Sequence, residues 1–411
     1  MAAVDFCGKW FAFTCDKKLI AIHTKQTREP FVFDCSTAER KPKNAKDDNS
    51  SDGGASEETG SDKILAFTVS PSGKLAVLTD DNKRLVLFHC EPSWQCVSTR
   101  FVVRRCTSLL FSQAEDELLV ADKSGDVYSF SVVEPQREGE LRMGHLSMLL
   151  SITTSPDNKY IITADRDEKI RVSHLRSPYN IQSFCLGHQQ FVSALLVPSG
   201  HPRWLLSGSG DGTVKLWEYE SGRKLQSWDL TELGETPSSE ADKQKKTTVC
   251  RIISSPDAHH IAVQCERVST VQFFSLDQEG GERLVANSRL SLPHCPLDMT
   301  FDPEGRLWVL MDSSNAPLQI YTHTPDSWKC EPESPELSRV TEAFKPHWET
   351  LEASARTNNR FEHLYKVSFD NVTAYMQKKQ ERLEEQQVKR KMSQEANGSK
   401  KAKKNGTQSF T

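Results

Sequence analysis

Residues 144–173, GHLSMLLSITTSPDNKYIITADRDEKIRVS, and residues 187–222, GHQQFVSALLVPSGHPRWLLSGSGDGTVKLWEYESG, are two successive copies of one unit. Each copy begins with Gly-His and passes through an apolar strand and a polar turn into a second strand. A tight turn with an Asp then leads into a third strand of alternating apolar residues. A unit of roughly 40 to 45 residues built in this way is the signature of one blade of a β-propeller. The pair therefore predicts an all-β fold.

Third strands of this kind recur seven times along the chain, which predicts a seven-bladed WD40-type β-propeller. The two longest spacings between them contain polar insertions, residues 41–62 and 231–247, which lack apolar periodicity and are predicted to be disordered loops. Tetrapeptides such as SPDN (155–158) recur in phase and predict type I turns. The third strands are aligned on the turn residues Arg28, Asn82, Ser124, Asp167, Asp211, Val268 and Asn315.

The chain is predicted to divide into three regions. The propeller occupies residues 1–340, a C-terminal extension at 341–372 packs on it, and residues 373–411 form a basic helix and a disordered tail. The helix is expected because TAYMQKKQERLEEQQVKRK is rich in helix-forming residues and contains neither Gly nor Pro. The ring can close through a strand around Val4–Cys7 or through the strand-like LYKVSFDNV (364–372), and the sequence leaves both alternatives open.

Composition limits the class of protein. The 411 residues carry a net charge of −4, but residues 376–411 hold ten Lys or Arg and only four Glu. An acidic body with a basic tail confines nucleic-acid contacts to the tail and to local patches. The 11 cysteines include no CxxC pair, which argues against a zinc site or a disulfide framework. Because neither a membrane span nor a signal peptide is evident, we expect no membrane contact and a location in the nucleus, with the cytoplasm left open.

The Gly-His pairs favour a structural role over catalysis. His145 lies 22 residues before Asp167, and His188 lies 23 residues before Asp211. Such a pairing suits a hydrogen-bond relay from the imidazole to the turn carboxylate, which Ser207 and Trp217 would complete in the second copy. The glycines of GSGDG join two strands and precede no helix, so they do not form a phosphate-binding loop. No catalytic residue, metal ligand or cofactor site is predicted in this chain.

The stretch ADRDEKIRV (164–172) departs from the repeat because it places five consecutive charges in a turn that needs one Asp. One interpretation is a solvated turn with Arg171 in an internal ion pair. The other is a docking surface on which opposite charges select a partner and set its register. Lys123, on the equivalent turn of the preceding blade, would extend that surface. The candidate partner-binding residues are Lys123, Asp165, Arg166, Asp167, Glu168, Lys169 and Arg171.

The basic C-terminal run has two compatible interpretations, phosphate binding and nuclear import, because both need only exposed positive charge. The helical clusters are the better candidates for RNA contact, since a helix fixes its charges on one face. The cluster KKAKK (400–404) is the better candidate for import. The candidate RNA-contact residues are Lys378, Lys379, Arg382, Lys389, Arg390 and Lys391.

A family resemblance rests on several stretches taken together: RRCTSLLF (104–111), LLVADKSGDVYSFSV (118–132), GHLSMLL (144–150), ITADRDEKIRVS (162–173), SFCLGH (183–188) and LYKVSFDNVTAYMQKKQERL (364–383). As a set they resemble the WD-repeat non-catalytic subunit of the eukaryotic tRNA (guanine-N7-)-methyltransferase. The resemblance spans nearly the whole chain.

The resemblance implies a heterodimer in which a separate catalytic subunit carries S-adenosylmethionine and methylates guanine N7 in tRNA. This chain would then be a scaffold that holds the catalytic subunit in its active form and helps to position the tRNA. In the family the partner docks at the region that corresponds to Asp165–Arg171 here, with Lys123 close by.

Two other functions are compatible with a propeller. One is a WD-repeat substrate adaptor for a ubiquitin ligase or a genome-maintenance scaffold, because the fold alone does not exclude it. The other is an enzyme with its site in the central channel, which would require acids or metal ligands that converge on the inner strands. The sequence contains no such set.

Overall fold

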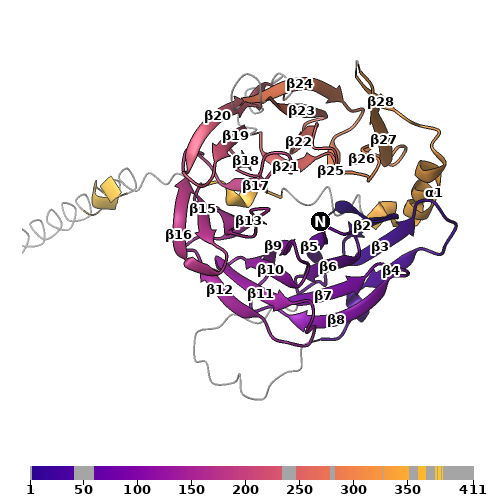
Figure 1. The fold of residues 1–411 in the computed structure, drawn as a ribbon, viewed down its shortest axis with the longest axis horizontal. Coiled ribbons are helices and arrows are strands. Elements are labelled where there is room, and N and C mark those ends of the chain that lie inside the picture. The colour runs from indigo at the N-terminus through magenta and orange to yellow at the C-terminus, as the bar shows by residue number, and fades with distance from the viewer. Residues whose placement is uncertain are drawn as a thin grey trace, which may run out of the picture. The chain divides into compact units, whose positions relative to one another are not determined.

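A computed structural model describes residues 2–40, 60–233, 247–277, 283–325, 327–350, 360–366, 375–376, 378–380 and 382. The chain divides into two units, Met1–Tyr365 and Lys366–Thr411. In the first unit the strands form seven four-stranded antiparallel sheets that stand around a ring as blades (Figure 1). The predicted seven-bladed all-β propeller is therefore confirmed.

Each blade is built from four consecutive strands, of which the first is innermost. Blades 1 to 3 contain β1 (Ala3–Cys7), β2 (Trp10–Cys15), β3 (Lys18–His23), β4 (Phe31–Asp34), β5 (Ile64–Val69), β6 (Leu75–Asp80), β7 (Arg84–His89), β8 (Gln95–Phe101), β9 (Cys106–Phe111), β10 (Glu117–Asp122), β11 (Asp126–Ser131) and β12 (Glu140–Gly144).

Blades 4 to 7 repeat this plan. They contain β13 (Leu149–Thr154), β14 (Tyr160–Asp165), β15 (Ile170–His174), β16 (Ser177–Cys185), β17 (Val192–Leu196), β18 (Trp204–Ser209), β19 (Thr213–Glu218), β20 (Arg223–Asp229), β21 (Val249–Ser254), β22 (Ile261–Cys265), β23 (Thr270–Asp277), β24 (Arg283–Ser291), β25 (Pro296–Phe301), β26 (Leu307–Met311), β27 (Leu318–His323) and β28 (Trp328–Cys330).

The predicted third strand of blade 1 is wrong. The segment FVFD, aligned through Arg28, is the fourth strand β4, and the third strand is β3 (Lys18–His23). Blade 1 joins its first three strands by two-residue hairpin turns, with Gly8 at φ 56° and Asp16 at φ 53°. Positive φ is what such tight hairpins require. Because blade 1 lacks the longer turn that marks the other blades, its strands are out of phase with the repeat.

The recurring tetrapeptides join the first and second strands of their blades. In SPDN, the backbone N–H of Asn158 donates to the carbonyl of Ser155 at 3.0 Å, and Asn158 has φ 55°. SPSG, SPDA and DPEG form the same turn, with positive φ at Gly73, Ala258 and Gly305. The predicted turns therefore occupy corresponding places in four blades.

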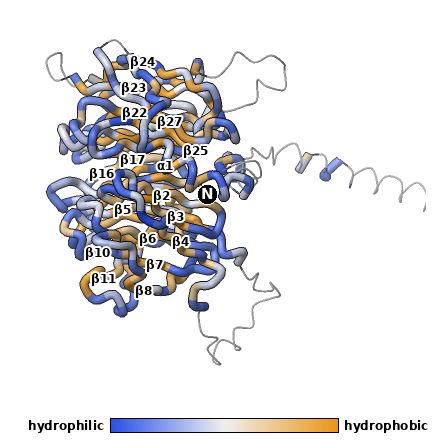
Figure 2. The backbone as a smooth tube through the Cα atoms, turned by 90° about the vertical axis from the view of Figure 1, so that its right-hand side faces the viewer, coloured by the Kyte–Doolittle hydropathy of each residue, from blue (hydrophilic) through white to orange (hydrophobic). Residues whose placement is uncertain are grey.

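The core lies between the blades. Apolar side chains on both faces of each sheet pack against the neighbouring blades, so the buried strands are hydrophobic while the connecting loops are polar (Figure 2). Blade 4 illustrates the pattern, because every residue of β14 is buried. A strand covered on both faces reads as a nearly continuous apolar run.

The ring closes without exchange of a strand. Strand β1 belongs to blade 1 and lies beside β25 of blade 7. The backbone N–H of Val4 donates to Asp298 Oδ2 at 2.8 Å, and Trp308 packs against Phe6 and Phe11 with ring centroids 5.3 and 5.2 Å apart. Val4–Cys7 thus does not complete the last blade. The described residues of the other candidate, 364–366, also form no strand.

Helix α1 (Pro335–Phe344) covers the closure between blades 7 and 1. The helix begins at the capping residue Ser334, whose side chain accepts from the N–H of Leu337. Its face of Leu337, Val340 and Phe344 packs into the cluster shared by blades 1 and 7. The strands end at Cys330 and α1 begins before residue 340, so the extension starts earlier than the expected boundary.

The short 3-10 helices are η1 (Cys35–Thr37), η3 (Thr231–Leu233), η5 (Lys345–His347) and η6 (Glu362–Leu364). Helix η3 occupies the start of the predicted insertion 231–247, and residue 247 is also described. Residues 234–246 lie outside the described residues, as do 41–59 of the other insertion.

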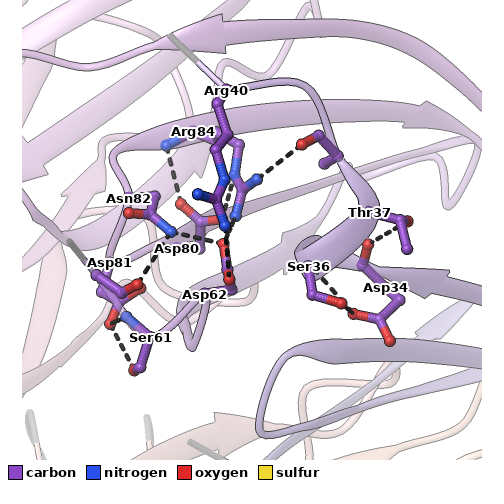
Figure 3. A network of polar contacts seen from close by, with 12 residues as sticks. Asp34, Ser36, Thr37, Arg40, Ser61, Asp62, Asp80, Asp81, Asn82 and Arg84 are labelled. Carbon is purple, nitrogen blue, oxygen red and sulfur yellow. Dashed lines mark hydrogen bonds and ion pairs between the residues drawn. The ribbon is translucent and has the colours of Figure 1, made fainter.

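Arg84 ties the two ends of the first insertion to blade 2 (Figure 3). Its guanidinium is fully buried and donates to Asp80 Oδ2 at 2.6 Å, to the carbonyl of Ala38 at 3.1 Å, and to Asp62. Asp62 also accepts from Asn82 Nδ2 at 2.6 Å. The residues on either side of 41–59 are therefore held together by one side chain.

Candidate functional site

The charged turn of blade 4 connects β14 to β15 and comprises residues 166–169. The corresponding turn of blade 5 has the same length, because Ala164 pairs with Ile170 and Gly208 pairs with Val214 across the two hairpins. Glu168 has φ 64° at the position where blade 5 has Gly212 with φ 77°, and few residues other than Gly adopt this conformation. Lys169 is exposed, whereas Arg166, Asp167 and Glu168 are half-buried.

Asp165 has a structural role in this turn. Its side chain is buried, and Oδ1 accepts from the N–H groups of Asp167 and Lys169 at 2.9 and 3.1 Å. Asp122 in blade 3 accepts in the same way from the N–H of Asp126, four residues later, at 3.1 Å. Asp165 therefore shapes the turn, and the residues after it present their side chains on the surface.

The relay of blade 4 uses Asp165 and not Asp167. His145 Nε2 lies 2.8 Å from Thr163 Oγ1, and His145 Nδ1 lies 3.4 Å from Asp165 Oδ2. The expected pairing with Asp167 is wrong, because Asp165 places a carboxylate at the position that Ser209 holds in blade 5, and His145 meets that carboxylate. Asp167 is half-buried in the turn.

Arg171 lies next to this turn, on the adjoining part of β15. Its Nη1 donates to the carbonyl of Gly144 at 3.1 Å, and it forms no ion pair within the described part of the chain. Burial lowers the pKa of Arg171 from its usual value, while the charge of Asp165 acts in the opposite direction. The internal ion pair that one interpretation assigns to Arg171 is not formed among the described residues, and a half-buried guanidinium lies at the edge of the charged turn.

The C-terminal segment 360–365, part of the extension predicted to pack on the propeller, contacts this turn, although no local pattern predicts the place of contact. Arg166 Nε donates to the carbonyl of Leu364 at 3.1 Å. The neighbouring His363 is exposed, and its pKa is lowered by partial burial and by the positive charges of Lys123 and Arg166. Lys123 on blade 3 and the blade 4 turn thus lie around the same segment. We call the surface formed by Lys123, Arg166, Asp167, Glu168, Lys169 and Arg171 the docking surface.

Blade 5 contains a complete relay. His188 Nδ1 lies 3.0 Å from Asp211 Oδ2, His188 Nε2 lies 2.7 Å from Ser207 Oγ, and Trp217 Nε1 donates to Ser207 Oγ at 2.8 Å. Burial would raise the pKa of Asp211, but hydrogen bonds from His188 and Thr213 hold it well below its usual value. Burial lowers the pKa of His188. Every polar group is engaged in holding the blade, so the site is structural.

Comparisons with known proteins show which family the chain belongs to. The family model described as the tRNA methyltransferase TRM82 WD40 domain matches residues 16–140 and 131–330. A protein of Danio rerio named tRNA (guanine-N(7)-)-methyltransferase non-catalytic subunit wdr4 is 57% identical over 410 residues, which cover 100% of this chain and 98% of the relative. The chain belongs to this family.

Other members of the family are also similar along most of their length. The Homo sapiens non-catalytic subunit WDR4 is 46% identical over 90% of this chain and 89% of its own length. The Culex quinquefasciatus subunit named wuho is 28% identical over 93% of this chain and 92% of its own. A chain in the crystal structure of a mitotic checkpoint complex matches with a TM-score of 0.59 and 13% identity, covering 80% of this chain and 86% of that chain, and shows the propeller fold alone.

The structure describes three of the predicted RNA-contact residues. Lys378, Lys379 and Arg382 are helical and exposed within the second unit. Lys389, Arg390 and Lys391 lie outside the described residues. No helix in the described part of the chain combines the length and apolar character needed to cross a membrane.

The inner strands of the propeller hold a cluster of polar side chains at the closure of the ring. Arg251 Nε lies 3.3 Å from Asp298 Oδ1, and Asp5 Oδ1 accepts from Thr300 Oγ1 at 3.2 Å. Burial raises the pKa of Asp5. Among the described residues no group of three His, Cys, Asp or Glu could hold a metal ion. The two carboxylates are engaged by Arg251, Thr300 and backbone groups that join blades 6, 7 and 1, which is a structural arrangement.

Proposed function

We propose that this chain is the non-catalytic scaffold subunit of a heterodimeric tRNA (guanine-N7-)-methyltransferase. The observation that carries the proposal is its 57% identity, over its whole length, to a protein named as that subunit. The chain holds the catalytic subunit in its active form and helps to position tRNA. S-adenosylmethionine belongs to the catalytic partner, since this sequence has no glycine-rich loop that leads into a helix.

The docking surface is our proposed contact with the catalytic subunit. It is supported by two structural facts: Asp165 shapes the turn that presents Asp167, Glu168 and Lys169, and Arg171 makes no ion pair within the described residues. A carboxylate of the partner beside Arg171 would supply the missing countercharge, and basic groups would face Asp167 and Glu168. Complementary charges of this kind fix register and partner choice.

The basic tail is our proposed tRNA contact. Exposed cations on a helix can neutralise phosphates without reading sequence. Lys378, Lys379 and Arg382 are exposed on such a helix, and Lys389, Arg390 and Lys391 extend the charge along the sequence. KKAKK (400–404) would serve nuclear import, which places the complex in the nucleus in this proposal.

The docking surface is tested by co-purification of the full chain with the catalytic subunit. Asp167→Lys and Arg171→Ala are each expected to weaken heterodimer formation by roughly ten-fold or more, because each removes one partner of a desolvated charge contact. The matched controls are Glu134→Lys and Arg137→Ala, which alter an exposed ion pair in a turn at the opposite end of the strands.

The controls should pair normally with the catalytic subunit. Unchanged pairing by both docking variants, with correct folding verified by thermal melting, would place the interface elsewhere on the propeller. Isothermal titration calorimetry gives the affinities directly.

A further inference from the structure

Residues 360–365 lie across the turns between the second and third strands of several consecutive blades. The segment contacts blade 4 through Arg166, blade 5 through Gly210 and blade 6 through Glu266, which accepts from the backbone of Arg360. These turns belong to three different sheets, and the C-terminal segment contacts all of them. We call residues 360–365 the clasp.

Aromatic packing fixes the centre of the clasp. The ring of Phe361 stacks on Phe191 with centroids 5.8 Å apart and an angle of 12° between planes. Tyr365 meets the same Phe191 edge to face at 5.0 Å. Gly210 makes this packing possible, because a Cβ there would lie 2.6 Å from atoms of the Phe191 ring. One glycine of GSGDG therefore serves the clasp as well as the hairpin.

Polar contacts fix the end of the clasp. Tyr365 Oη donates to the carbonyl of Gly210 at 3.0 Å and lies 2.6 Å from Thr248 Oγ1, which can donate to it. Burial raises the pKa of Tyr365, so its hydroxyl stays protonated and able to donate at neutral pH. Arg166 holds the carbonyl of Leu364, one residue earlier. The last residue of the propeller unit is thus anchored by side chain and backbone.

The clasp also determines where the basic tail begins. Tyr365 is the last residue of the propeller unit, and Lys366 starts the second unit. Arg166, which holds Leu364, belongs to the docking surface, and His363 lies within the electrostatic influence of Lys123. The covalent origin of the tail is therefore fixed beside the surface assigned to the catalytic subunit.

We propose that the clasp fixes the root of the basic tail beside the docked catalytic subunit, and that Arg166, Phe191 and Tyr365 act as positioning residues for tRNA binding. This inference rests on the proposed function, in which the tail contacts tRNA and the partner occupies the docking surface. A tail held at a fixed root meets the bound tRNA at a higher effective concentration than a loosely attached one. Arg166 thereby serves the tail as well as the docking surface.

The test separates the position of the tail from its charge. A flexible Gly/Ser insertion of about 20 residues between Tyr365 and Lys366 leaves the clasp and every basic residue intact, but lets the tail move away. The matched control carries the same insertion after Thr411. A second variant, Phe361→Ala with Tyr365→Phe, removes the stacking of residue 361 on Phe191 and both contacts of the Tyr365 hydroxyl. A third neutralises Lys378, Lys379, Arg382, Lys389, Arg390 and Lys391 to Gln.

Each variant is purified as the full heterodimer, and its Kd for an unmodified tRNA transcript is measured at several salt concentrations. The insertion after Tyr365 is expected to raise the Kd roughly three- to ten-fold, because effective concentration falls with linker length. The melting temperature and the affinity of the two subunits should stay at their wild-type values for this variant. The clasp double variant should raise the Kd similarly, and the control insertion should not.

Three outcomes of these Kd measurements decide whether the clasp positions the tail and whether the tail binds tRNA. A higher Kd for the insertion at unchanged dimer affinity supports the clasp as a positioning element. An unchanged Kd for the insertion, with a higher Kd and a weaker salt dependence on charge neutralisation, overturns the clasp but leaves the proposed tail function in place. An unchanged Kd on neutralisation overturns the tail function and the clasp together.

Discussion

At the scale of single residues, the histidines of the two Gly-His copies meet different carboxylates of their turns. The pairing of His188 with Asp211 follows from their separation in the repeat, and the structure contains it. The pairing of His145 with Asp167 does not occur, because blade 4 has the carboxylate of Asp165 at the position that Ser209 holds in blade 5. Apolar periodicity indicates the strands, whereas it does not indicate which side chain of a turn a histidine meets. Turn residues are therefore the least predictable part of a repeat.

The relay of blade 5 predicts a pH dependence of stability. Burial holds the pKa of His188 in the folded chain below 6.5, its usual value and the one expected in the unfolded chain. At a pH between the two pKa values, the unfolded chain therefore binds a proton that the folded chain does not. The free energy of unfolding should therefore fall as pH decreases from 7.5 to 5.5, by up to about 1.4 kcal/mol per pH unit for this group. His188→Gln should be less stable at pH 7.5 and lose less on acidification.

Urea unfolding of the full chain at both pH values measures this difference. His259→Gln, which changes an exposed histidine, is the control and should follow the wild-type curve. Equal pH dependence of the wild type and His188→Gln would show that the relay histidine is not the titrating group.

At the scale of elements, the repeat predicts strands and type I turns but not what joins distant segments. Arg84 joins distant segments in this way. It binds Asp80 on its own blade, and it also binds Ala38 and Asp62, which lie on either side of an insertion. The insertion is recognisable from composition, whereas its attachment is not. The clasp is missed for the same reason, because contacts of Phe361 with Phe191 follow from no local pattern.

The Arg84 junction predicts a large loss of stability on substitution. Arg84→Met should lower the free energy of unfolding by roughly 3–5 kcal/mol, because Asp80 and Asp62 would remain buried without a cation. Arg40 is the control, since its side chain is 72% exposed and lies 4.0 Å from Asp62. Arg40→Ala should change stability by less than about 1 kcal/mol. Denaturant titration that gives similar values for both variants would mean that Arg84 does not hold the insertion.

At the scale of the whole molecule, the seven blades follow from the sequence, but the closure of the ring does not. Closure depends on Val4 meeting Asp298 and on Phe6 and Phe11 meeting Trp308, residues from opposite ends of the propeller. The charged stretch ADRDEKIRV is visible in the sequence because it breaks the repeat, and the structure shows how Asp165 presents the residues that follow it. A propeller whose inner acids are engaged in closure, and whose charged turn is partly exposed, fits a scaffold subunit.

The most direct test of this account is methyl transfer to guanine N7 of an unmodified tRNA transcript, measured with S-adenosylmethionine. The account predicts no transfer by this chain alone, full transfer by the chain together with the catalytic subunit, and a loss of transfer when the chain carries Asp167→Lys or Arg171→Ala. The Arg137→Ala control should retain full transfer. Methyl transfer by this chain alone, or full transfer by a catalytic subunit that lacks it, would contradict the account.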